Sequence, residues 1–122
     1  LMRSSAASDV YKRQVFTDPE VATVGLTDDA CKKEGITCKV HKGFYRSNGK
    51  ALADEATEGL AKIVTDDEGR IIGCHILGAH AADMVQEIAA LMNQDVTLAQ
   101  LADIVHIHPT FGEIIQDIAI NS

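Results

Sequence analysis

Apolar and polar residues alternate in short stretches along the first two thirds of the chain, a pattern typical of strands with one buried face. Residues 20–25 and residues 36–45 each predict such a strand. Between them, Thr27 is placed to cap a short helix over residues 28–34, and Gly35 is placed to end it. This part of the chain therefore predicts a strand, a helix and a second strand.

A β-hairpin is the clearest local prediction. Residues 59–65 and 70–77 are two apolar runs, and the polar stretch at residues 66–69 between them ends in a glycine, as in a tight turn. Residues 46–56 fit neither a strand nor a helix clearly, although Asn48-Gly49 is a turn signal.

After Gly78 the apolar period changes from two to between three and four, which predicts helices. A helix of about four turns carries Ala81, Met84, Val85, Ile88, Ala89 and Met92 on one face. Thr97 starts a shorter helix with Leu98, Leu101, Ala102 and Val105, and a last helix carries Ile114, Ile115, Ile118 and Ala119. Hairpin-joined strands followed by helices predict an α+β fold, an antiparallel β-sheet with helices packed on it.

The length of 122 residues is that of one domain. Residues 1–14 show no apolar period and begin with a leucine, so we interpret them as a non-native or disordered N-terminal segment. Residues 15–122 are then the folded domain.

Charge and cysteine content narrow the classes of partner. The net charge of −7 disfavours nucleic acid and anionic membranes, and no apolar run approaches the ~20 residues of a membrane span. The three cysteines form no Cys-x-x-Cys pair, which favours free thiols in a reducing, cytoplasmic compartment.

Chemical character is concentrated in residues 106–114, His-Ile-His-Pro-Thr-Phe-Gly-Glu-Ile. If Glu113 accepts a hydrogen bond from one ring nitrogen of His108, it fixes the tautomer and raises the affinity of the other nitrogen for a proton. Pro109 follows directly, and a cis His-Pro bond would fix the direction of the ring. The segment is thus a candidate acid–base site.

Two other interpretations of the same residues remain open. Thr110-x-x-Glu113 is also a capping box for the last helix, and a glutamate that serves the imidazole is less available to the cap. Alternatively, His106, His108 and Glu113 could bind a metal, but Pro109 breaks a strand and no fourth ligand is evident, so no metal site is predicted.

The order of four motifs resembles a known family. His108-Pro109-Thr110-x-x-Glu113 is similar to the C-terminal interface domain of the flavin-dependent pyridine-nucleotide disulfide oxidoreductases. Residues 16–25, 59–64 and 72–78 resemble the opening, the central strand and the following strand of that domain. Within the family, the His106-x-His108 pair and Met84-Val85-x-Glu87 resemble the dihydrolipoyl dehydrogenases, with the glutathione reductases as the alternative.

The resemblance implies a homodimer joined through this domain, with the two longer helices and the last helix buried against a second copy. It implies FAD and NAD in the full-length enzyme, and a lipoyl-bearing protein or a small disulfide as substrate. His108 and Glu113 would be catalytic, and His108 and Pro109 would lie against the flavin of the partner subunit. The chain lacks Gly-x-Gly-x-x-Gly and a close cysteine pair, so we expect it to bind no cofactor and to be inactive alone. A purely structural dimerisation module is the other possibility.

Overall fold

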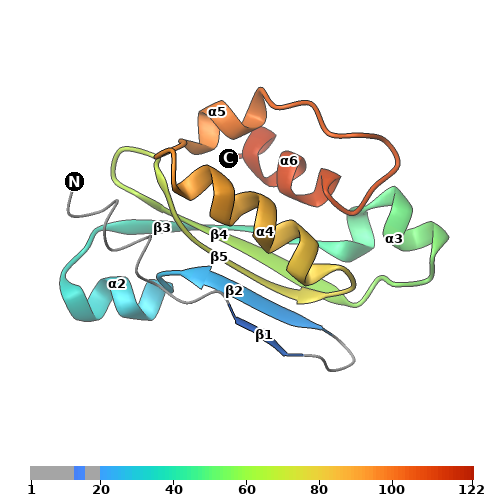
Figure 1. Ribbon diagram of the computed structural model, residues 1–122, viewed down its shortest axis with the longest axis horizontal. Coiled ribbons are helices and arrows are strands. Elements are labelled where there is room, and N and C mark those ends of the chain that lie inside the picture. Colours follow the sequence, from blue (N-terminus) through green and yellow to red (C-terminus); the bar gives the residue numbers. More distant parts are fainter. Residues whose placement is uncertain (1–12, 16–19) are drawn as a thin grey trace.

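One five-stranded sheet organises the computed structural model, which describes residues 13–15 and 20–122. The strands are β1 (Arg13–Val15), β2 (Val21–Gly25), β3 (Cys38–Phe44), β4 (Gly59–Asp66) and β5 (Ile71–Gly78). Their order is β1-β2-β5-β4-β3, and every neighbouring pair is antiparallel (Figure 1). The predicted α+β architecture is confirmed.

The predicted hairpin is β4 and β5, at the centre of the sheet. Asp66 fixes its turn, because one carboxylate oxygen of this residue accepts hydrogen bonds of 2.9 Å from the backbone amides of both Glu68 and Arg70. The side chain of Asp66 is almost fully buried, which strengthens these bonds by excluding water. A local polar contact therefore sets the register of the two strands that carry most of the core.

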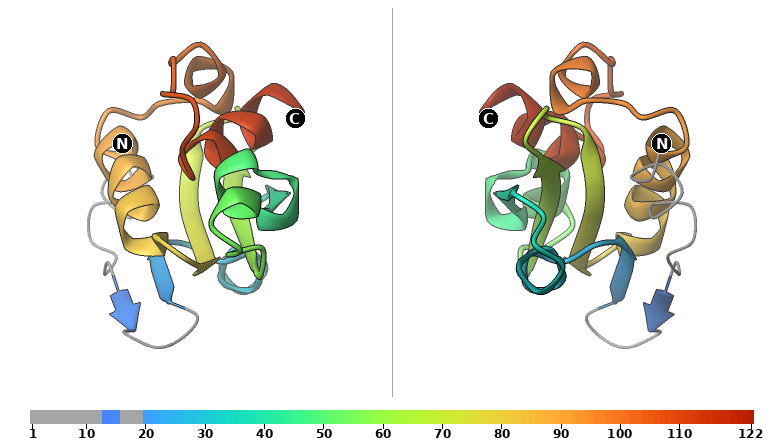
Figure 2. Two further views of the ribbon diagram at one scale, coloured as in Figure 1. Left: turned by 90° about the vertical axis from the view of Figure 1, so that its right-hand side faces the viewer. Right: turned by 90° about the vertical axis from the view of Figure 1, so that its left-hand side faces the viewer.

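Three of the helices lie along one side of the sheet. The helices are α2 (Asp28–Glu34), α3 (Gly49–Ala53), α4 (Ala81–Met92), α5 (Leu98–Ala102) and α6 (Glu113–Ile120), with a 3-10 turn, η1, at Tyr45–Ser47. Helix α4 covers β2 and β5, α6 covers β3 and β4, and α5 packs against α6 (Figure 2). Among the described residues, every helix is too short or too polar to cross a bilayer.

The apolar faces of α4 and α6 are buried against the sheet of their own chain. Their buried members are Ala81, Met84, Val85, Ile88, Ala89 and Met92 on α4, and Ile114, Ile115, Ile118 and Ala119 on α6. The prediction that these helices are also buried against a second copy stays a prediction, and such a contact would use other surfaces of the helices than these faces.

Helix α2 covers part of the opposite side of the sheet. Successive residues of β4 face opposite sides of the sheet. Ile63 belongs to the main core, whereas Val64 packs with Cys31 of α2 and with Ile72. The hydroxyl of Thr27 accepts a hydrogen bond from the amide of Ala30, as predicted for the cap of this helix. A small second core thus holds α2 in place.

Two segments end differently from the sequence prediction. Arg13 and Gln14 lie in β1, paired with β2, while residues 1–12 and residues 16–19 of the family-like opening motif lie outside the described residues. Helix α5 ends at Ala102, so the prediction that Val105 belongs to its apolar face is wrong. Val105 is 88% exposed in the segment that follows.

Gly73 of β5 provides a test of this packing. A Cβ at this position would lie 2.0 Å from the backbone oxygen of Leu26, a residue whose amide is hydrogen-bonded to the backbone oxygen of Ile72. We expect Gly73→Ala to lower the free energy of unfolding by about 2 kcal/mol or more, because overpacked cores distort their surroundings. Gly49→Ala is the control, since its Cβ would meet no atom within 4 Å. Urea unfolding measures both, and equal midpoints would contradict the predicted crowding.

Candidate active site

The candidate residues His106, His108 and Pro109 lie on the irregular segment between α5 and α6, residues 103–112, and Glu113 is the first residue of α6. Phe111 anchors the C-terminal end of the segment in the core, 7% exposed. The ring centroid of Phe111 lies 5.7 Å from that of Tyr45 and 4.8 Å from that of His80. These contacts join the segment to η1 and to the start of α4.

Asn48 ties the same end of the segment to α3. Its side-chain amide nitrogen donates to the backbone oxygen of Thr110 at 3.0 Å, and its oxygen accepts from the amide of Ala51 at 2.9 Å. The side chain is buried, so both bonds are shielded from water. The sequence indicates a turn at Asn48-Gly49 but carries no signal for this partner 62 residues away.

His108 and Glu113 are hydrogen-bonded, as predicted. The Nδ1 atom of His108 lies 2.9 Å from Oε1 and 3.2 Å from Oε2 of Glu113. A carboxylate only accepts, so Nδ1 carries the hydrogen and Nε2 is left as the proton acceptor in the neutral ring. The side chain of His108 is 79% exposed, and the His108–Pro109 peptide bond is cis.

Glu113 also accepts a backbone hydrogen bond at the start of α6. Its Oε1 accepts a hydrogen bond of 3.0 Å from the amide of Thr110, which is one half of the predicted capping box. The other half is absent, because the hydroxyl of Thr110 donates instead to the backbone oxygen of Ile107 at 2.7 Å. The expectation that a glutamate bonded to the imidazole is less available to the cap is therefore wrong, since Oε1 accepts from both.

These donors hold the pKa of Glu113 below its usual range. The amide of Thr110 contributes most to the lowering of this pKa, and the hydrogen bond from His108 follows. A hydrogen bond to the charged form favours that form. The ionised carboxylate is thus the stable state of the site near neutral pH.

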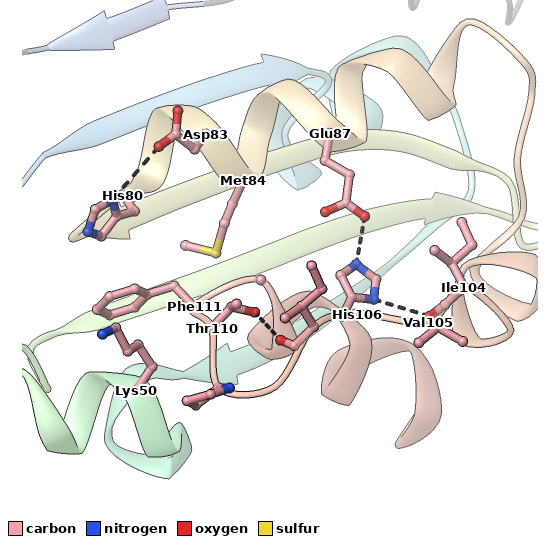
Figure 3. A pocket seen from close by; sticks show the side chains of 13 residues that line it. Lys50, His80, Asp83, Met84, Glu87, Ile104, Val105, His106, Thr110 and Phe111 are labelled. Atoms are coloured by element: carbon pink, nitrogen blue, oxygen red, sulfur yellow. Dashed lines mark hydrogen bonds and ion pairs between the residues drawn. The ribbon is translucent and has the colours of Figure 1, made fainter.

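His106 has different hydrogen-bond partners from His108. Its Nε2 lies 2.7 Å from a carboxylate oxygen of Glu87 on α4, and its Nδ1 lies 3.1 Å from the backbone oxygen of Ile104 (Figure 3). The alternative metal site of His106, His108 and Glu113 is not assembled. Among the described residues, no three His, Cys, Asp or Glu side chains are grouped to hold a metal ion.

A cavity of about 560 Å³ opens between α4 and the segment. Met84 and Glu87 of α4 form one wall, and His106 and Thr110 belong to the other (Figure 3). Ile104 and Val105 line it as well, so its surface is mainly apolar. Neither His108 nor Glu113 lines this cavity, but their neighbours along the chain, Ile107, Pro109 and Gly112, do.

The three cysteines lie elsewhere and are free thiols. Burial raises the pKa of Cys31 to about 12 and raises that of Cys74 above its usual range. Because the thiolate is the nucleophile, these two buried thiols are unreactive near neutral pH.

The lowered pKa of Glu113 predicts an acid-dependent loss of stability. A carboxyl with a lower pKa in the folded state stabilises the fold above the unfolded pKa, and this contribution is lost as pH falls through the folded pKa. We expect the side-chain carbon NMR signal of Glu113 to titrate below the range of free glutamate. His108→Ala should raise this pKa only in part, because the Thr110 amide still donates. Titration in the usual range in the parent chain would contradict the assignment.

Comparisons with known proteins identify the family of the chain. The family model for the pyridine nucleotide-disulphide oxidoreductase dimerisation domain matches residues 11–119. The dihydrolipoyl dehydrogenase of Synechocystis sp. is 40% identical over 107 residues, 84% of this chain and 23% of that protein. The dihydrolipoyl dehydrogenase of Bacillus subtilis is 38% identical over 106 residues, 86% of this chain and 23% of that protein. The chain thus spans about a quarter of the length of these relatives.

Solved structures share the fold. LpdA from Mycobacterium tuberculosis superposes with a TM-score of 0.86 at 23% identity, covering 95% of this chain and 25% of that one. The flavoprotein disulfide reductase RclA from Escherichia coli gives a TM-score of 0.85 at 21% identity, covering 91% and 26%. With the family model, these comparisons show that the chain belongs to the dimerisation-domain family of the pyridine nucleotide-disulphide oxidoreductases.

Proposed function

We propose that this chain is the dimerisation domain of a flavin-dependent oxidoreductase that oxidises dihydrolipoyl groups with NAD, and that His108 and Glu113 supply acid–base chemistry to the partner subunit's active site. The similarity to dihydrolipoyl dehydrogenases supports the class of reaction. One geometric observation supports the role of the pair: Nδ1 of His108 is held by Glu113 while the rest of the ring is exposed.

In the proposed reaction, Nε2 of His108 removes a proton from one thiol of the dihydrolipoyl group. The thiolate is then the nucleophile toward a disulfide held by the rest of the enzyme. Overall the dithiol loses two electrons and two protons to become a cyclic disulfide, while NAD gains a hydride and one proton is released. His108 is therefore the first proton acceptor of the sequence.

Glu113 supports the proton transfer in two ways. Its carboxylate orients the ring through Nδ1, and it stabilises the positive charge that the ring gains with the proton. Because the amide of Thr110 also donates to Oε1, the carboxylate is fixed before the substrate arrives. Such preorganisation reduces the rearrangement needed during the reaction.

The cofactors have their main binding sites outside this chain, whose sequence lacks the Gly-x-Gly-x-x-Gly fingerprint. Bound FAD would carry the two electrons from sulfur to NAD. His108 and Pro109 are both exposed, which fits a contact with the edge of the flavin in a partner subunit. The free thiols fit a reducing compartment such as the cytoplasm. A glutathione reductase-like enzyme and a non-catalytic dimerisation module are the competing functions.

Removal of the base tests the catalytic role. Residues 15–122 would replace the corresponding domain of the Synechocystis dihydrolipoyl dehydrogenase, and kcat for dihydrolipoamide would be measured with NAD. We expect His108→Gln to lower kcat by about 10²- to 10⁴-fold, the usual contribution of a general base. Light scattering should show an unchanged dimer.

The matched control is His41→Gln, which removes an imidazole that is hydrogen-bonded to Thr65 and lies on β3 rather than on the segment that carries His108. This control should keep kcat within about twofold, as expected for a substitution away from the reacting groups. Full turnover in His108→Gln would favour the non-catalytic module.

The proposed dimer predicts a specific contact surface. Val105 and Ile107 are 88% and 77% exposed, although apolar side chains of this size are usually buried. We expect light scattering of the chain to show a dimer that the double substitution Val105→Asp and Ile107→Asp converts to monomer, because charges would be buried at the contact. A dimer that survives both substitutions would place the interface elsewhere.

A further inference from the structure

We propose that Glu87 of α4 is a positioning residue for the acid–base site, acting through His106 to hold the segment that carries His108. This inference rests on the proposed function, because it assigns a second pair of residues to the same chemistry. His106 lies on the wall of the cavity opposite α4, and Glu87 lies on α4 itself (Figure 3).

Both ring nitrogens of His106 face acceptors. Nε2 meets the Glu87 carboxylate at 2.7 Å, and Nδ1 meets the carbonyl oxygen of Ile104 at 3.1 Å. Neither acceptor can donate, so both bonds form together only when both nitrogens carry hydrogen. The contact with Glu87 is then a charge-assisted hydrogen bond, which is shorter and stronger than a neutral one. With its side chain 8% exposed, His106 is shielded from competing water.

Apolar burial does not hold this part of the segment. Val105 and Ile107, the neighbours of His106, are 88% and 77% exposed. Helix α5 has already ended at Ala102, and the next contact with the core comes from Thr110 through Asn48. His108 therefore lies between two polar anchors, and the pair of His106 and Glu87 is the anchor on its N-terminal side.

The two pairs are also connected by charge. The positive charge of His106 contributes to the lowered pKa of Glu113, after the larger effects of Thr110 and His108. The ring of His106 also lies near the start of α6, since its Cδ2 atom is the nearest neighbour of a Cβ built at Gly112. His106 thus acts on both the position and the charge state of the site.

The closest comparison on the same helix is Asp83, one turn earlier. Its carboxylate also lines the cavity, but its partner is His80 at 3.7 Å, and its side chain is 88% exposed (Figure 3). Removal of this carboxylate changes the charge of α4 by the same amount without releasing the segment. Asp83→Ala is therefore the matched control for Glu87→Ala.

The test uses the chimeric enzyme described above and a double-mutant cycle. Glu87→Ala and His106→Ala should each lower kcat by about 10- to 100-fold, the effect of misplacing a reacting group by roughly 1 Å. KM for dihydrolipoamide should stay within twofold, and the double variant should be no slower than either single variant, since both remove one contact. Glu87→Gln, which keeps an acceptor for Nε2, should restore most of the rate.

A second readout needs no cofactor or substrate. In the 122-residue chain, Glu87→Ala should speed amide hydrogen exchange at residues 104–110, whereas Asp83→Ala should leave it unchanged. Unchanged exchange in Glu87→Ala, or a kcat within twofold of the parent while His108→Gln is inactive, overturns the proposed positioning role. Full activity of His108→Gln overturns the proposed function instead, and the exchange experiment then still decides whether Glu87 holds the segment.

Discussion

The carboxylate of Glu113 is the interaction on which the candidate site depends. One of its oxygens accepts from the amide of Thr110 and from Nδ1 of His108, so a single side chain both begins α6 and directs the imidazole. Stability and chemistry are therefore coupled at this point. The donors that lower the pKa of Glu113 favour its ionised form, and an ionised carboxylate stabilises the positive charge that an imidazole gains when it accepts a proton.

The sheet contributes by bringing distant residues to one place. Asn48 follows β3, Glu87 lies on α4, and both contact the segment before α6. Because α4 covers β2 and β5 whereas α6 covers β3 and β4, the segment that leads into α6 can reach both Glu87 on α4 and Asn48 next to α3. The antiparallel order β2-β5-β4-β3 thus fixes the separation of the two anchors before any side chain of the site is considered.

Local patterns predicted most of the fold, because their signals act within a few residues. The cap of α2 at Thr27, the hairpin turn at Asp66 and the apolar face of α4 are all encoded this way. The hydrogen bond of His108 with Glu113 was predictable for the same reason, five residues apart. Asn48 and Glu87 were not recognised as site residues, since their partners lie 62 and 19 residues away and depend on the packed sheet.

The side chain of His108 is exposed to solvent, which favours a chemical role over a purely structural one. A histidine that only stabilised the last helix would gain from burial, yet this ring is 79% exposed while its carboxylate partner is 25% exposed. Next to it, Val105 and Ile107 present apolar surface, and the adjoining cavity is open. The approach of a second polypeptide would cover this apolar surface and bring a reacting group to the oriented ring. These features therefore support the proposal that the chain contributes half of a site, which fits a family defined by its dimerisation domain.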